Sequence, residues 1–138
     1  MTWKKLSAGA RECLERLKSA GYAAYPVGGC VRDVLLGREP GDVDICTAAH
    51  PEAVMALFPR AVPTGIVHGT VTIPTEDGNV EITTFRRDGD YADARHPDSV
   101  SFDAGLLEDL RRRDFTVNAM AMDSDGEVID PLGGRKDL

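Results

Sequence analysis

Two carboxylates separated by one residue, Asp42 and Asp44, are the residues of this sequence whose type and spacing point most directly to chemistry. They alternate with the branched apolar residues Val43 and Ile45, and a period of two is typical of a β-strand. Both carboxylates then face one side, about 6.6 Å apart along the strand. Two carboxylates this close repel each other unless a cation neutralises them, and carboxylate oxygens are ligands that Mg²⁺ prefers. The pair therefore predicts a divalent metal site.

The Asp-x-Asp pattern alone is weak evidence, because it occurs three times in the chain. The copies at 88–90 and 123–125 contain or precede a glycine, which is typical of solvated turns. Only the copy at 42–44 has the sequence context of a strand.

A glycine pair, Gly28 and Gly29, precedes the carboxylates and follows a short apolar run at 23–27. A helix-like segment at 31–36 comes next. A strand, a glycine turn and the start of a helix bring backbone N–H groups close to an anion. The arrangement predicts a phosphate site, and a tight turn with no ligand is the alternative.

The elements that must position these residues follow from the spacing of apolar side chains. Helical spacing predicts packing helices over 6–17 and 51–58, and Gly21 is placed to end the first. A period of two predicts strands over 70–73 and 80–85 around a turn at 76–79. Together these elements predict an α+β fold with a mixed sheet packed by helices on one side.

Glu81 is the candidate for a third carboxylate. Within its predicted strand, Val80 and Ile82 share one face, so Glu81 lies on the other. If the sheet carries Asp42 and Asp44 on that same face, Glu81 joins the metal site. A solvated glutamate on a strand is the alternative.

The second half of the chain predicts a loop over 86–99 and then a helix that leads into three adjacent arginines at 111–113. Three adjacent arginines on a helix cannot all face one way, so one or two could reach a phosphate or a ribose. A solvated cluster is the alternative. A final hairpin is expected from 119–123 and 127–129.

Composition limits the classes of function. The chain has 138 residues, enough for one domain, and its net charge of −7 argues against a broad electrostatic grip on nucleic acid. Three cysteines without a Cys-x-x-Cys pair indicate a reduced, cytoplasmic setting. No apolar run approaches the roughly 18 residues that span a bilayer, so no membrane association is expected.

Taken together, the motifs of this chain resemble those of class II CCA-adding tRNA nucleotidyltransferases and bacterial poly(A) polymerases. These enzymes belong to the nucleotidyltransferase superfamily that includes DNA polymerase beta. The resemblance covers essentially the whole chain and implies the N-terminal catalytic head, with a mixed, mostly antiparallel sheet. The residues that carry it are, in chain order, Gly28-Gly29 with Arg32-Asp33, Asp42 and Asp44, Glu81, Arg112-Arg113-Asp114-Phe115-Thr116 with Asn118-Ala119, and Asp130-Pro131 with Gly133-Gly134.

The resemblance also implies roles for these residues. Two Mg²⁺ ions and three carboxylates would activate the 3′-hydroxyl of the RNA and steady the departing pyrophosphate. A second group of residues would bind the nucleotide, with Gly29 and Arg32 at the triphosphate and Asp114 at the ribose. The catalytic and metal-binding set is Asp42, Asp44 and Glu81, and the nucleotide-binding set is Gly28, Gly29, Arg32, Arg113 and Asp114.

The implied activity is addition of CMP and AMP, from CTP and ATP, to the 3′ end of tRNA. In this family a neck domain with a Glu-Asp-x-x-Arg motif chooses the base, and body and tail domains hold the tRNA. None of these is in residues 1–138, so we expect the isolated head to be inactive or unselective. Poly(A) synthesis and CC-only or A-only addition remain open, as does a non-catalytic nucleotide-binding module.

Overall fold

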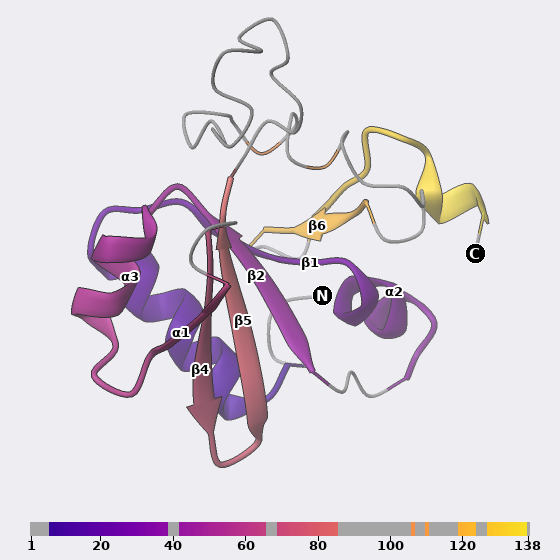
Figure 1. Ribbon diagram of the computed structural model, residues 1–138. Helices are drawn as coiled ribbons and strands as arrows, with labels where there is room; N and C mark the ends of the chain where they lie inside the picture. Colours follow the sequence, from indigo (N-terminus) through magenta and orange to yellow (C-terminus); the bar gives the residue numbers. More distant parts are fainter. Residues whose placement is uncertain are drawn as a thin grey trace, which may run out of the picture.

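The computed structural model describes residues 6–38, 42–65, 69–85, 106, 110, 119–123 and 127–137. Helices and strands alternate along its first half and form a seven-stranded sheet in the order β3-β4-β5-β2-β1-β6-β7 (Figure 1). The elements are α1 (Ala8–Ser19), β1 (Ala24–Val27), α2 (Gly29–Leu35), β2 (Val43–Thr47), α3 (Pro51–Leu57), β3 (Val62–Gly65), β4 (Thr70–Thr75), β5 (Gly78–Thr84), β6 (Ala121–Met122), β7 (Val128–Ile129) and the 3₁₀ helix η5 (Gly134–Asp137).

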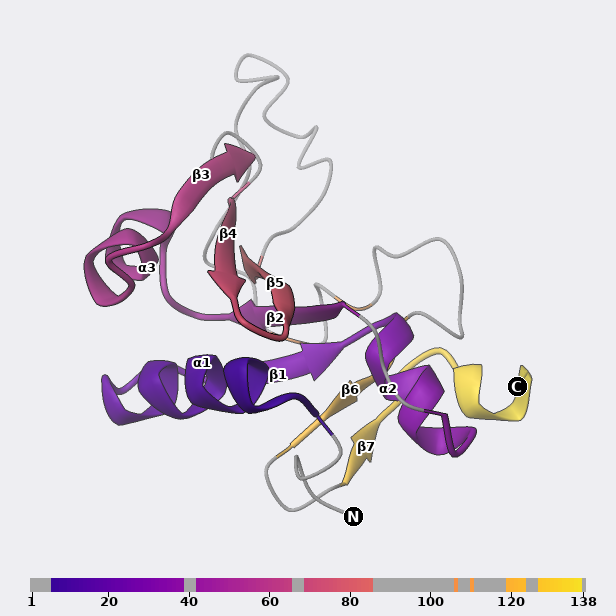
Figure 2. The ribbon, with the colours of Figure 1, turned by 90° about the horizontal axis from the view of Figure 1, so that it is seen from below.

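The sheet is mixed and mostly antiparallel, as predicted. Its central strand, β2, runs parallel to its neighbour β5, and every other neighbouring pair is antiparallel. Figure 2 shows the twist of the sheet, with β3 and β4 turned steeply away from the direction of β1 and β2. Parallel pairing needs a long crossover, and the chain between β2 and β5 supplies it with α3, β3 and β4.

Helix α1 forms for the reason that its sequence predicts. Ser7 is the N-cap, and its hydroxyl accepts a hydrogen bond from the N–H of Ala10 at 3.2 Å. Its apolar stripe is buried, and Gly21 adopts a φ of 95° just beyond the helix. Helix α3 likewise confirms the prediction over 51–58 to within one residue.

The two faces of the sheet differ. One face carries the main core, which joins buried side chains of α1, α2 and α3 to alternate residues of β2 and β5, such as Ile45 and Ile82. The opposite face has a smaller cluster that contains Val27, Cys46 and Phe85. Helices α1, α2 and α3 therefore pack on one side of the sheet, as predicted, while the smaller cluster on the other side also includes the helical residue Leu110.

The hairpin of β4 and β5 is tighter than predicted. Thr75 pairs with Gly78, so the turn is only Glu76 and Asp77 and both strands extend further toward it. Strand β3 was not predicted as a separate element. The final hairpin is confirmed as β6 and β7, whereas the loop at 86–99 and the arginines at 111–113 lie outside the described residues. No helix in the described part of the chain is long and apolar enough to cross a membrane.

Candidate functional site

Asp44 on the central strand β2 lies opposite Glu81 on the neighbouring strand β5. They are Cα partners in the parallel pairing of β2 and β5, and neighbouring strands are about 4.8 Å apart. The residues that flank them, including Ile45 and Ile82, are buried in the main core, so the two carboxylates point to the opposite face of the sheet. Glu81 therefore shares a face with Asp44, as the sequence predicts.

Asp42 lies just before β2, which begins at Val43. Its side chain is exposed, and its Oδ1 is 3.7 Å from the point where a Cβ on Gly78 would lie. Asp42 is therefore next to the first residue of β5. Within the described ranges, however, no group of three or more His, Cys, Asp or Glu side chains is arranged to hold a metal ion. The predicted trio shares one region of the sheet without converging on one point.

A hydrogen bond that we did not predict holds the Glu81 side chain. Thr72 is the cross-strand partner of Glu81 on β4, and its hydroxyl donates to Glu81 Oε2 at 2.9 Å. The Thr72 oxygen also lies 2.6 Å from the hydroxyl of Thr64 on β3. The sequence carries a signal for this contact, because Thr70 and Thr72 put a polar period of two on the β4 face that meets Glu81.

The glycine turn between β1 and α2 is fixed by backbone hydrogen bonds. The N–H of Gly28 donates to the carbonyl of Met120 at 3.0 Å, and its carbonyl accepts from the N–H groups of Val31 and Arg32 at 3.1 and 3.2 Å. Gly28 has φ 77° and ψ −135°, a conformation in the mirror image of the β region that only glycine adopts readily. The predicted turn is therefore present and requires glycine at its first position.

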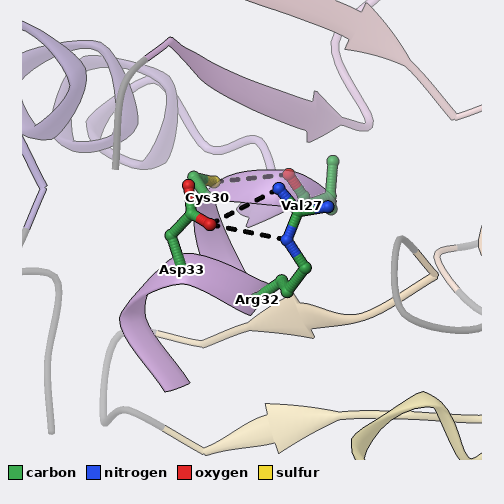
Figure 3. Close-up of polar contacts among 4 residues, drawn as sticks. All are labelled: Val27, Cys30, Arg32 and Asp33. Atoms are coloured by element: carbon green, nitrogen blue, oxygen red, sulfur yellow. Dashed lines mark hydrogen bonds and ion pairs between the residues drawn. The ribbon is translucent and has the colours of Figure 1, made fainter. Parts of the chain in front are cut away.

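Arg32 projects from α2 beside this turn, as Figure 3 shows. Its Nε and Nη2 atoms both lie 3.4 Å from Oδ1 of Asp33. The same Nη2 is 3.4 Å from the point where a Cβ on Gly29 would lie. The guanidinium of Arg32 therefore lies close to Gly29, with its charge partly balanced by Asp33.

Cys30 packs beneath the turn. Its thiol donates to the carbonyl of Val27 at 3.3 Å (Figure 3), and burial raises the pKa of this thiol to about 11. The thiol is therefore protonated near neutral pH, and its role is packing.

Comparison with known proteins decides the family. Residues 24–138 match the family described as "Poly A polymerase head domain". The chain belongs to this family. Its sheet and helices accordingly form a nucleotidyltransferase head, as the resemblance implied.

Relatives of this head domain are CCA-adding enzymes. The chain is 57% identical to the CCA-adding enzyme of Geobacillus stearothermophilus over 123 residues, which are 89% of this chain and 30% of the relative. The crystal structure of the Bacillus stearothermophilus CCA-adding enzyme in complex with CTP matches 92% of the chain and 30% of the solved chain, at 52% identity with a TM-score of 0.80. A tRNA nucleotidyltransferase complexed with a primer tRNA and an incoming ATP analog matches 91% of the chain and 36% of its own, at 35% identity with a TM-score of 0.70. The chain thus spans about a third of the length of these relatives.

Two residues of the predicted nucleotide site, Arg113 and Asp114, lie outside the described residues of this head domain. The described part of the site is therefore the carboxylate face of β2 and β5 together with the turn that carries Gly28, Gly29 and Arg32.

Proposed function

We propose that this chain is the catalytic head of a CCA-adding tRNA nucleotidyltransferase, which transfers CMP and AMP from CTP and ATP to the 3′ end of tRNA. The observation that carries the proposal is the in-register pair of Asp44 and Glu81 on the face opposite α1, α2 and α3. Membership of the head-domain family supports it. The CCA-adding relatives favour CCA addition over poly(A) synthesis.

The donor set suits a hard divalent cation. Asp42, Asp44 and Glu81 offer only carboxylate oxygens, which Mg²⁺ prefers, and each side chain has rotatable bonds that allow it to turn toward the others. We assign these residues as the ligands of two Mg²⁺ ions. The ions would neutralise charge on the triphosphate and lower the pKa of the attacking 3′-hydroxyl.

The glycine turn and Arg32 would hold the triphosphate. Absence of a side chain at Gly29 allows phosphate oxygens to approach the backbone, and the planar guanidinium of Arg32 suits bidentate contacts with them. Asp33, now near that guanidinium, would keep it oriented until the nucleotide arrives. From the resemblance we add Arg113 as a nucleotide contact and Asp114 at the ribose.

Base choice and the grip on tRNA are assigned to neck, body and tail domains of the kind that the family has, with residues 1–138 as the head. The net charge of −7 fits a division in which other domains bind most of the tRNA. We place the protein in the cytoplasm, because its three cysteines are buried thiols.

Calorimetric titration of the 138-residue chain with CTP and with ATP tests the nucleotide site. We expect binding that requires Mg²⁺ and discriminates little between the bases. Asp44→Asn keeps the side-chain shape but removes the charge, and should weaken binding more than about 10-fold, since even residues behind metal ligands contribute 10- to 100-fold. Asp77→Asn is the matched control, because Asp77 lies in the hairpin turn and bonds to the N–H of Gly9. Equal binding by wild type and Asp44→Asn would contradict the proposal.

An assay of nucleotide transfer to tRNA distinguishes an enzyme from a non-catalytic nucleotide-binding module. In a protein that joins this head to its neck, body and tail domains, Asp42→Ala should abolish addition of CMP and AMP to tRNA that lacks its CCA end. Addition at the wild-type rate would show that the metal assignment is wrong.

A further inference from the structure

The polar face of β4 carries a short chain of hydroxyl groups that ends on Glu81. Thr72 donates to Glu81 Oε2, because an ionised carboxylate can only accept. A hydroxyl has a single proton, so Thr72 must accept the bond that joins it to Thr64 at 2.6 Å. The direction of both bonds is therefore fixed, from Thr64 through Thr72 to Glu81.

An irregularity in β3 brings Thr64 into this chain. Val62 pairs with Thr72 but Gly65 pairs with Thr70, so β3 has one residue more than β4 between the two pairs. In an unbroken antiparallel register Thr64 would lie opposite Thr70 instead. Bulges of this kind redirect side chains and are frequent beside active sites. Here the bulge turns the Thr64 hydroxyl toward Thr72.

We propose that Thr72, supported by Thr64, is a positioning residue that holds Glu81 for its role at the metal site. Thr72 is 6% exposed whereas Glu81 is only partly buried, so the more buried side chain orients the more exposed one. The bond occupies Oε2 and leaves Oε1 for a ligand. This inference rests on the proposed function of Glu81 and adds the residue that acts through it.

The test measures binding of Mn²⁺ to the 138-residue chain by the loss of the electron paramagnetic resonance signal of the free ion. Thr72→Val preserves shape and strand propensity but removes the hydroxyl, and we expect about 10- to 100-fold weaker binding, the usual effect of losing a group that orients a metal ligand. Thr72→Ser restores the hydroxyl and should bind within about 3-fold of wild type. Circular dichroism verifies that each variant is folded.

The matched control is Thr83→Val. Thr83 lies on β5 on the same face as Glu81, but its hydroxyl pairs with Thr70 at 3.0 Å and not with a carboxylate. We expect its Mn²⁺ affinity to equal that of wild type. If Thr83→Val lost as much Mn²⁺ affinity as Thr72→Val, both losses would be explained by a general disturbance of the sheet. That result would overturn the proposal.

A double variant shows whether Thr72 acts through Glu81. If it does, Glu81→Gln lowers affinity and Thr72→Val adds no further loss in the Glu81→Gln background. Additive losses, unchanged binding in Thr72→Val, or tighter binding would each overturn the positioning role while leaving the metal assignment intact. Wild-type affinity in Glu81→Gln would instead show that Glu81 is not a ligand, and both assignments would fail together.

Discussion

The adjacent glycines at the start of α2 should respond in opposite ways to the same substitution. Gly28 has φ 77° and ψ −135°, and a side chain in such a conformation costs about 1–3 kcal/mol. Gly29 has no positive φ, and a Cβ there would meet only the terminal atoms of Arg32, Nη2 at 3.4 Å and Cζ at 3.9 Å. Alanine is also the better helix former by up to about 1 kcal/mol. Gly28→Ala should therefore destabilise the fold, whereas Gly29→Ala should not.

Thermal unfolding converts these energies into temperatures. For a domain of this size 1 kcal/mol corresponds to about 3–5 °C, so Gly28→Ala should lower the Tm by about 3–15 °C. Gly29→Ala should unfold at or slightly above the wild-type temperature. Its effect should appear instead in calorimetric titration with Mg²⁺ and CTP, where the new methyl group would hinder the approach of phosphate oxygens to the backbone and should weaken binding by about 3- to 10-fold.

Gly37→Ala is the control for backbone strain outside the site. Gly37 has φ 75° in the turn after α2, and a Cβ there would have nothing within 4 Å. The Gly37→Ala variant should have a free energy of unfolding about 1 kcal/mol below that of wild type and should keep the wild-type affinity for CTP. A Gly28→Ala variant as stable as wild type would refute the strain argument, and a Gly29→Ala variant with unchanged CTP affinity would refute the role given to that corner of α2.

Two further predictions concern the core. Thr84 is fully buried and its hydroxyl donates to the carbonyl of Ala49 at 2.7 Å, so Thr84→Val should lower the free energy of unfolding by about 1–3 kcal/mol in denaturant titrations, with no change in CTP binding. Burial, and then the nearby Glu12 charge, raises the pKa of the Cys13 thiol from 9.0 to about 11. The folded state therefore keeps this proton where the unfolded state loses it, and stability should fall between about pH 9 and pH 11, by at most about 1.4 kcal/mol per pH unit. Denaturant titrations across this range should show a shallower decline in Cys13→Ala.

The sequence predicts those parts of the site that depend on local periodicity. Alternation places Asp44 and Glu81 each on the polar side of its own strand, and the structure confirms both assignments. Alternation cannot show that the two strands are neighbours, because the parallel pairing of β2 and β5 depends on the crossover between them. From the sequence, Asp44 and Glu81 could be assigned to one site only through the resemblance of the motifs to those of the family. Which atoms a side chain bonds is also beyond the sequence. The bond from Thr72 to Glu81 requires them to be cross-strand partners, in a hairpin whose turn is two residues shorter than predicted.

Stability and chemistry are divided between the two faces of β5. Ile82 and Thr84 point into the main core, whereas Glu81 points to the opposite face, where its partner is Thr72 on β4. On this face Glu81 is only half-buried, so close packing alone does not restrain its long carboxylate side chain. A buried hydroxyl on the neighbouring strand supplies that restraint without covering the site. Threonine-to-valine changes at 72 and 84 remove the same group from opposite faces, so the first should change binding and the second stability.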